Sequence, residues 1–185
     1  MYSNPKQAYL WLSPDDPPKS IAKPSLHPNK LLLCVWWTTA GVVHHEVLKT
    51  GETVTADVYC QQLKRVSRAL LAKQPALVNR HQVLLLHDNA PVHVAKKSQE
   101  EIRKLRWEML PHPPYSPDLS PTDFHLFRSL ANFMREKEFK KSDEVESEVQ
   151  KFFGSKTPAF FEQGMEDLVL RWAKVIDNNG DYFDE

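Results

Sequence analysis

The stretch Leu84–His93, LLLHDNAPVH, begins with apolar residues and then stops on an acid, an amide and a proline. Its first part belongs to Gln82–Asp88, which predicts a short strand buried on both faces, as in a parallel sheet. The spacing of apolar residues over Val94–Arg106 predicts a helix, and Trp107–Leu110 predicts a second strand. A strand, a helix and a strand in this order form a βαβ unit with parallel strands. The predicted fold class is therefore α/β.

A hairpin and a helix are predicted before this unit. Leu31–Trp37 (LLLCVWW) and Val42–Leu48 (VVHHEVL) flank a short turn that contains glycine, which favours a β-hairpin. After the hairpin, apolar residues recur at helical spacing, with Thr55 as the predicted N-cap and Pro75 marking the end. In the proline-rich segment at the start of the chain, only Ala8–Leu12 (AYLWL) predicts a strand.

The segment after the second strand is stiff and leads into a helix. Five prolines between positions 111 and 121 keep this segment extended, because each one disfavours helix for the residue before it. Ser120 is the predicted N-cap, Pro121 fits the first helical position and Asp123 occupies the third. The predicted buried face of this helix consists of Phe124, Phe127, Leu130 and Met134. Asp123 is thus a carboxylate held by a stiff leader and a capped helix.

The rest of the chain is predicted to support a single core. Two amphipathic helices are predicted, over Ser142–Phe153 and from Thr157 to just before Gly180. The chain has 185 residues, of which 41% are hydrophobic, and this fits one domain. Its 24 basic and 24 acidic residues balance, so net charge is no evidence for or against a polyanionic partner.

The cysteines and the apolar runs exclude several classes of protein. Cys34 and Cys60 are the two cysteines and neither belongs to a C-x-x-C pair, which indicates reduced, buried thiols. Together with His44 and His45 they lack the spacing of a zinc site. No run of eighteen apolar residues is present, and the first residues lack the apolar core of a signal peptide. We therefore expect a soluble, intracellular protein.

Asp88 and Asp123 are the candidate functional residues, and each alone has an ordinary explanation. Asp88 followed by Asn89 is compatible with a simple turn after a strand. Asp123 is compatible with an acid that interacts with the dipole of its helix. Taken together, an acid that ends a central strand and an acid that opens a later helix are able to meet at one sheet edge. There they would hold a divalent metal through oxygen ligands.

The motifs H-D-N-A-P-x-H and Y-S-P-D-L-S-P-T-D-F resemble the catalytic domain of mariner-type transposases, and further similarity extends over nearly the whole chain. Thirty-four residues separate Asp88 from Asp123, which is the family's spacing between its second and third catalytic aspartates. The resemblance implies a ribonuclease-H-like fold of the retroviral-integrase type, a mixed sheet flanked by helices. It also implies a nuclear enzyme that cuts transposon ends and joins them to target DNA.

By this resemblance Asp88 and Asp123 are the catalytic residues and ligands of Mg²⁺ or Mn²⁺. The implied chemistry is phosphoryl transfer with two metal ions, which activate a water or a DNA 3′-hydroxyl. The candidates for residues that orient these ligands without binding the metal themselves are Asn89, His87 and His93. Asp118, in the Y-S-P-D turn, is a tempting alternative but does not align with the third acid.

The chain departs from the family at its start. The family needs three acids, and the first lies on the first strand of the sheet, in a stretch without counterpart here. Met1–Asn4 resembles the tail of that strand, and Asp15 and Asp16 are poor substitutes because they lie between prolines. The paired helix-turn-helix region of the family is absent as well. We expect residues 1–185 to form one catalytic domain that is incomplete at its N-terminus, lacks the first central strand, is marginally stable and does not cleave DNA.

The expected partners are DNA, as transposon ends and target, and a second copy of the chain in a homodimer. No membrane and no small-molecule substrate are expected. Basic side chains that are candidates for phosphate contact are Lys96, Lys97, Arg103, Lys104, Arg128, Arg135 and Lys137. The alternative function is that of a non-catalytic nucleic-acid-binding or dimerising protein derived from a transposon.

Overall fold

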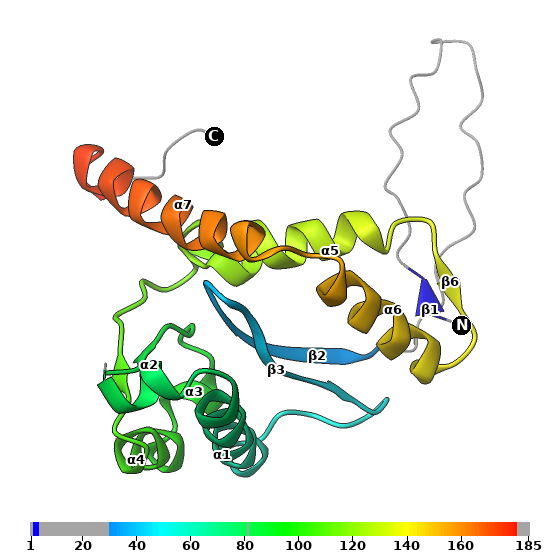
Figure 1. The fold of residues 1–185 in the computed structure, drawn as a ribbon, viewed down its shortest axis with the longest axis horizontal. Coiled ribbons are helices and arrows are strands. Elements are labelled where there is room, and N and C mark those ends of the chain that lie inside the picture. Colours follow the sequence, from blue (N-terminus) through cyan, green and yellow to red (C-terminus); the bar gives the residue numbers. More distant parts are fainter. Residues whose placement is uncertain (1, 4–29, 81, 181–185) are drawn as a thin grey trace.

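Figure 1 shows the computed structural model of the chain, which describes residues 2–3, 30–80 and 82–180. The predicted strand Ala8–Leu12 and the acids Asp15 and Asp16 lie outside these residues. The described strands form three pairs, β1 with β6, β2 with β3 and β4 with β5. The pair of β4 and β5 is parallel and the other two pairs are antiparallel, so both strand orientations of a mixed sheet are present.

The predicted hairpin is confirmed. It consists of β2 (Leu32–Thr38) and β3 (Gly41–Leu48), which pair from Leu32 opposite Leu48 to Thr38 opposite Gly41. Gly41 has φ +128°, a conformation that side-chain-bearing residues rarely adopt, and this explains the glycine at the turn. The register shifts between Trp36 and Trp37, which marks a bulge in the ladder.

The hairpin lies between two layers of helices (Figure 1). On one side is α1 (Ala56–Lys73), and on the other are α5 (Arg128–Phe133), α6 (Ser142–Gly154) and α7 (Pro158–Asp177). Because strand side chains alternate between faces, successive residues of β2 join different cores. Trp36 packs with the α1 core, which includes Val43, Leu63, Val66 and Leu70. Leu33, Val35 and Trp37 pack with the other core, which includes Leu126, Leu130, Phe152 and Phe161.

Helix α1 begins where the sequence predicts. The Thr55 side chain accepts a hydrogen bond from the Val58 backbone N–H at 3.3 Å, which is the N-cap interaction. The helix ends at Lys73, and Pro75 opens a further short helix, α2 (Pro75–Arg80), that was not predicted.

The βαβ unit is confirmed, although its elements differ in detail from the prediction. The strands β4 (Leu84–Leu85) and β5 (Glu108–Met109) are parallel but only two residues long. The prediction of a strand buried on both faces is wrong, because Leu84 is 55% exposed. Within the described residues, β4 pairs with β5 alone.

The single helix predicted over Val94–Arg106 is two helices. They are α3 (Pro91–Val94) and α4 (Lys96–Lys104), and the break between them is Ala95, whose ψ of 138° is not helical. The Ser98 hydroxyl donates a hydrogen bond to the Val92 carbonyl at 2.5 Å and so holds the two helices together.

The helix that carries Asp123 is wound differently from the prediction. After the short 3₁₀ turn η1 (Pro117–Leu119), the π-helical segment η2 (Thr122–Phe127) runs directly into α5. The Ser120 carbonyl accepts the backbone N–H groups of Asp123 and Phe124, so the start is as predicted, but no side-chain hydrogen bond caps it. The wider π turn rotates the buried face, so Leu126 is fully buried while Phe124 and Phe127 are half-buried.

The two C-terminal helices, α6 and α7, are confirmed, with Phe152 and Phe161 buried between them and the hairpin. A further strand, β6 (Glu138–Phe139), was not predicted and pairs with β1 (Tyr2–Ser3). In the described part of the chain β1 therefore adjoins β6, and it forms no ladder with β2 or β4. No helix in the described ranges is both long enough and apolar enough to cross a bilayer.

We expect Gly164→Ala to destabilise the protein. A Cβ at this position of α7 would lie 2.8 Å from His125 Cδ2 and 3.0 Å from Trp37 Cη2. The His125 ring has little room to move, because its Nε2 lies 2.8 Å from the Phe160 carbonyl oxygen. Overpacking costs about 1 to 3 kcal/mol and outweighs the gain of about 1 kcal/mol from alanine's helix propensity. Urea unfolding measures the difference.

Gly154→Ala is the matched control, because nothing lies within 4 Å of a Cβ built at Gly154. This variant should unfold at the same urea concentration as the unsubstituted chain or at a higher one. Unchanged stability of Gly164→Ala would show that the His125 and Trp37 rings shift freely.

Candidate active site

Asp88 lies just beyond the carboxyl end of β4, where the neighbouring strand also ends. Leu84 pairs with Glu108 and Leu85 with Met109, so the loops after β4 and β5 leave the same edge of the parallel pair. The Asn89 side-chain amide donates a hydrogen bond to the His112 carbonyl at 2.8 Å, across that edge. The predicted supporting residue Asn89 therefore ties the loop of the first candidate acid to the segment that leads to the second.

Two hydrogen bonds orient the Asp88 carboxylate, and both end on the same oxygen. The Ala90 backbone N–H donates to Oδ1 at 3.0 Å, and His93 Nδ1 lies 2.6 Å from Oδ1. Burial raises the pKa of Asp88, but the hydrogen bonds from Ala90 and His93 and the charges of His93 and His87 lower it below its ordinary value. The Asp88 side chain is 61% exposed, so an ionised carboxylate faces solvent here.

His87 and His93 lie behind this carboxylate together with a residue that the sequence did not single out. The Tyr59 hydroxyl, on α1, is 2.8 Å from His87 Nδ1. The two imidazole rings stack at 12° with centroids 4.8 Å apart, and the Tyr59 ring is 4.5 Å from His93. From the sequence, Tyr59 was one apolar position on a helix face. No sequence signal pairs it with a histidine 28 positions later.

Asp123 occupies the first turn of η2 and is exposed. Its side chain makes no hydrogen bond or ion pair with any described residue. The preceding Thr122 anchors this turn to the hairpin, because the Trp37 indole N–H donates to Thr122 Oγ1 at 3.0 Å. The position of Asp123 is therefore determined by contacts of its neighbour, and its own carboxylate is available for a ligand.

No cluster of metal-ligating side chains brings the two candidate acids together within the described residues. No three or more His, Cys, Asp and Glu side chains in residues 30–80 and 82–180 gather in the way that a bound metal requires. The convergence of Asp88 and Asp123 on one cation therefore stays a prediction. Mg²⁺ retains several waters when it binds to proteins, so two carboxylates from one chain suffice to begin such a site.

Asp118 is part of the turn before η2 and contacts α7. Its backbone carbonyl accepts a hydrogen bond from Arg171 Nη1 at 3.2 Å. One carboxylate oxygen, Oδ1, is buried without a hydrogen-bond partner in the described structure. The Arg171 guanidinium also lies 4.1 Å from the centroid of the Phe124 ring. Asp118 is therefore packed against α7.

Several of the basic residues predicted to contact phosphate are engaged within the protein. Lys97 pairs with Asp57, and Lys137 pairs with Glu148 at 2.6 Å. The exposed side chains of Lys96 and Arg103, both on α4, make no such pair within the described residues. Only part of the predicted basic set is therefore free to meet a polyanion.

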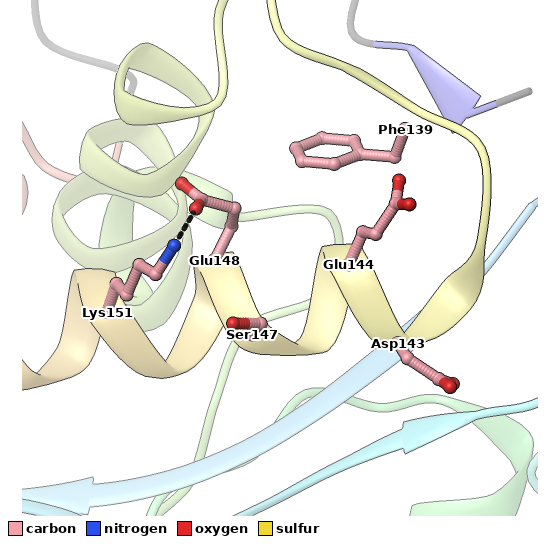
Figure 2. A pocket seen from close by; sticks show the side chains of 6 residues that line it. All are labelled: Phe139, Asp143, Glu144, Ser147, Glu148 and Lys151. Carbon is pink, nitrogen blue, oxygen red and sulfur yellow. Dashed lines mark hydrogen bonds and ion pairs between the residues drawn. The ribbon is translucent and has the colours of Figure 1, made fainter.

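An open hollow of about 450 Å³ lies on a different part of the surface, between β6 and α6 (Figure 2). Figure 2 shows its lining, which consists of Phe139, Asp143, Glu144, Ser147, Glu148 and Lys151. Glu148 accepts hydrogen bonds from Lys137 and Lys151, and both lower its pKa below the ordinary value. Neither Asp88 nor Asp123 lines this hollow, so it is not part of the candidate site.

Comparison with known proteins agrees with the motifs. A family model described as transposase, partial DDE domain, matches residues 1–80. The human histone-lysine N-methyltransferase SETMAR is 42% identical over 184 residues, which are 100% of this chain and 27% of that protein. The mariner Mos1 transposase of Drosophila mauritiana is 39% identical over 184 residues, which are 99% of this chain and 53% of that protein. The chain thus spans about half of one relative and about a quarter of the other.

Solved structures of Mos1 transposase share the fold. The Mos1 mariner paired end complex with Mn matches at a TM-score of 0.89 and 41% identity, over 98% of this chain and 53% of that chain. The Mos1 catalytic domain with raltegravir and Mg matches at a TM-score of 0.82 and 42% identity, over 86% of this chain and 80% of that chain. These matches confirm the predicted ribonuclease-H-like α/β fold.

Proposed function

We propose that residues 1–185 of this chain, which belongs to the mariner-type transposase family, form part of a catalytic domain of the kind that cleaves and joins DNA strands with divalent metal ions. One observation carries the proposal. Asp88 follows β4 at the edge where β5 also ends, and Asn89 is bonded across that edge to the segment leading to Asp123. Both acids are exposed, as ligands of a substrate-bound metal must be.

The donor atoms fit a hard divalent cation. Asp88 Oδ2 and both oxygens of Asp123 accept no hydrogen bond from the described residues, and carboxylate oxygens are the ligands that Mg²⁺ and Mn²⁺ prefer. Mos1 structures that resemble this chain are described with Mn and with Mg. We propose Asp88 and Asp123 as the residues of this chain that hold Mg²⁺ or Mn²⁺.

The surrounding residues orient the ligands. Ala90 and His93 orient the Asp88 carboxylate through Oδ1, and the Asn89 side chain joins the loops after β4 and β5 by a hydrogen bond. Asp88 and Asp123 would hold two such ions, which would supply activation of a water or a DNA 3′-hydroxyl and stabilisation of the leaving oxygen. The residues of this chain supply the negative charge and the fixed geometry for that arrangement.

The proposed partners are DNA, as transposon ends and target, and a second copy of the chain in the nucleus. A related Mos1 structure is described as a paired-end complex with the left transposon end. On this chain, Lys96 and Arg103 of α4 are exposed without ion pairs among the described residues, and such side chains are suited to phosphate contact.

We expect residues 1–185 to bind Mn²⁺ and to leave DNA uncut, because the sequence holds two of the three acids that the family pattern requires. Isothermal titration of the purified chain with Mn²⁺ measures binding, and nicking of a supercoiled plasmid in Mg²⁺ or Mn²⁺ measures cleavage. Asp118→Asn is the matched control, since Asp118 lies in the same segment as Asp123 but is packed against α7. It should bind Mn²⁺ as the unsubstituted chain does.

Two results would contradict this proposal in different ways. If the unsubstituted chain nicks the plasmid and Asp88→Asn does not, the expected inactivity is disproved, but the proposed metal site stands. Equal Mn²⁺ binding by the unsubstituted chain and Asp88→Asn would disprove the metal site.

A second function, DNA binding without catalysis, is favoured by the lack of a three-acid cluster in the described residues. Binding to duplex DNA that weakens steeply with salt, without any dependence on Mn²⁺, would support it.

A further inference from the structure

Tyr59, His87 and His93 form one continuous group, here called the aromatic stack, between α1 and the Asp88 carboxylate. Tyr59 is 3% exposed and belongs to the core of α1. Its ring and the His87 ring both lie against His93, with centroids 4.5 Å and 4.8 Å away. His93 is therefore held from two directions, and it holds Asp88 in turn at 2.6 Å.

The hydrogen bonds in the stack have a definite direction. Burial raises the pKa of the Tyr59 hydroxyl, which keeps its proton. Tyr59 Oη–H is therefore the donor available to His87 Nδ1, 2.8 Å away, and this pairing places the ring proton of an uncharged His87 on Nε2.

The last hydrogen bond of the stack joins His93 to the Asp88 carboxylate. An ionised carboxylate only accepts hydrogen bonds, so His93 is the donor. His93 Nδ1–H donates to Asp88 Oδ1, and the Ala90 N–H donates to the same atom. Oδ1 thus has two donors, whereas Oδ2 has none among the described residues. The two oxygens of one exposed carboxylate are therefore not equivalent.

We propose that the aromatic stack is a positioning device, in which Tyr59 and His93 hold Asp88 in one orientation with Oδ1 occupied and Oδ2 presented to a divalent cation. This inference rests on the proposed function, since it concerns the same site. It extends that site into the core of α1 and assigns a role to Tyr59. Tyr59 and His93 are positioning residues, because both act on the cation through Asp88.

The stack also explains why two histidines are half-buried beside an exposed acid. A lone aspartate after a strand would turn freely in solvent, and each metal-binding event would have to order it. Ligand orientation by hydrogen bonds from behind typically changes metal affinity by about 10-fold to 100-fold. We expect a loss of metal affinity of this size when His93 is substituted. The loss should be smaller when Tyr59 is substituted, because Tyr59 is one contact farther from Asp88.

The test uses the whole 185-residue chain and Mn²⁺ as the probe. We expect His93→Leu to weaken Mn²⁺ binding by about 10-fold or more, because it removes the donor to Oδ1. His93→Asn should restore most of the affinity, since the asparagine amide N–H reaches a position near that of Nδ1. Tyr59→Phe keeps the buried ring and removes only the hydroxyl, and should weaken Mn²⁺ binding by a smaller factor.

Nitrogen-15 NMR of the histidine rings in the metal-free protein supplies a second measurement. The unsubstituted chain should show His87 with an unprotonated Nδ1 and a protonated Nε2. Tyr59→Phe should shift His87 toward a mixture of tautomers. Val66→Ala is the matched control, because Val66 is a buried residue of the α1 core outside the aromatic stack. It should lower stability without changing the tautomer or the Mn²⁺ affinity.

The outcomes separate this inference from the function on which it rests. If Asp88→Asn loses Mn²⁺ affinity while His93→Leu and Tyr59→Phe keep it, the positioning role is wrong and the metal site stands. If the unsubstituted chain binds Mn²⁺ no better than Asp88→Asn, the proposed metal site fails and the role of the stack fails with it.

Discussion

Asparagine in place of Asp88 and of Asp123 is expected to weaken Mn²⁺ binding by at least about 10-fold for each single change, which is about 1.4 kcal/mol. Each substitution keeps the shape of the side chain and removes the negative charge that a hard cation requires. Thirty-four residues separate the two acids in the sequence, and each acid is exposed with at least one carboxylate oxygen that accepts no hydrogen bond from the described residues. A shared ion makes their contributions interdependent.

The double variant decides whether they share it. If both carboxylates bind the same metal ions, the double variant should lose less Mn²⁺ binding free energy than the sum of the two single losses. The expected coupling energy is about 0.5 to 3 kcal/mol. Isothermal titration of the four proteins completes the cycle, with Asp118→Asn as the charge-matched control. Strictly additive losses, or no loss from Asp123→Asn, would show that the two acids do not meet at one site.

Glu46→Gln is expected to lower the free energy of unfolding by about 2 to 3 kcal/mol at pH 7, and by much less at pH 3. Glu46 lies on β3 and binds Arg65 of α1 through both oxygens, at 2.5 Å and 2.9 Å. His44 and Gln62 also bond to it, at 2.7 Å and 3.2 Å. These bonds join the hairpin to α1, and the glutamate side chain is only 22% exposed.

The pH dependence follows from the direction of the shift. Burial raises the pKa of Glu46, but hydrogen bonds from Arg65, His44 and Gln62 and the charge of Arg65 lower it from 4.5 to about 2. A lowered pKa in the folded state means that the stabilisation is complete above pH 4.5. It is then lost as the pH falls from about 4.5 toward 2. The variant and the unsubstituted chain should therefore converge in stability over this range.

Urea unfolding at pH 7, 5, 4 and 3 measures this convergence. Glu166→Gln is the control, because Glu166 is exposed on α7 and makes no ion pair with a described residue. It should match the unsubstituted chain at every pH. A difference between Glu46→Gln and the unsubstituted chain that stays constant down to pH 3 would show that the Arg65 pair does not depend on ionisation of Glu46.

Local patterns predicted most of the elements. Two β-rich runs around a turn that contains glycine indicated the hairpin, and the Thr55 side chain caps α1 as expected. Apolar residues at helical spacing indicated α6 and α7 with nearly the observed bounds. These features depend on neighbours within a few residues, so the local sequence is sufficient to predict them. The resemblance to mariner-type transposases, with 34 residues between Asp88 and Asp123, likewise identified the two candidate acids.

Other features follow from contacts between distant segments, and local patterns predicted them incorrectly or not at all. Leu84 is 55% exposed although it lies in an apolar run, because the burial of a strand side chain depends on which distant segments pack over that face. Leu126 is more buried than Phe124 or Phe127 because η2 is wound as a π-helix. The Glu46 cluster and the aromatic stack join residues 19 and 28 positions apart.

The sequence by itself determined the α/β class, the order of the main elements and the two candidate acids, because each depends on short-range periodicity or on a fixed motif spacing. Only the tertiary structure decided which oxygen of Asp88 is left open and which side chains hold it. That choice depends on hydrogen-bond directions between α1, the end of β4 and α3, and such directions exist only once the chain has folded.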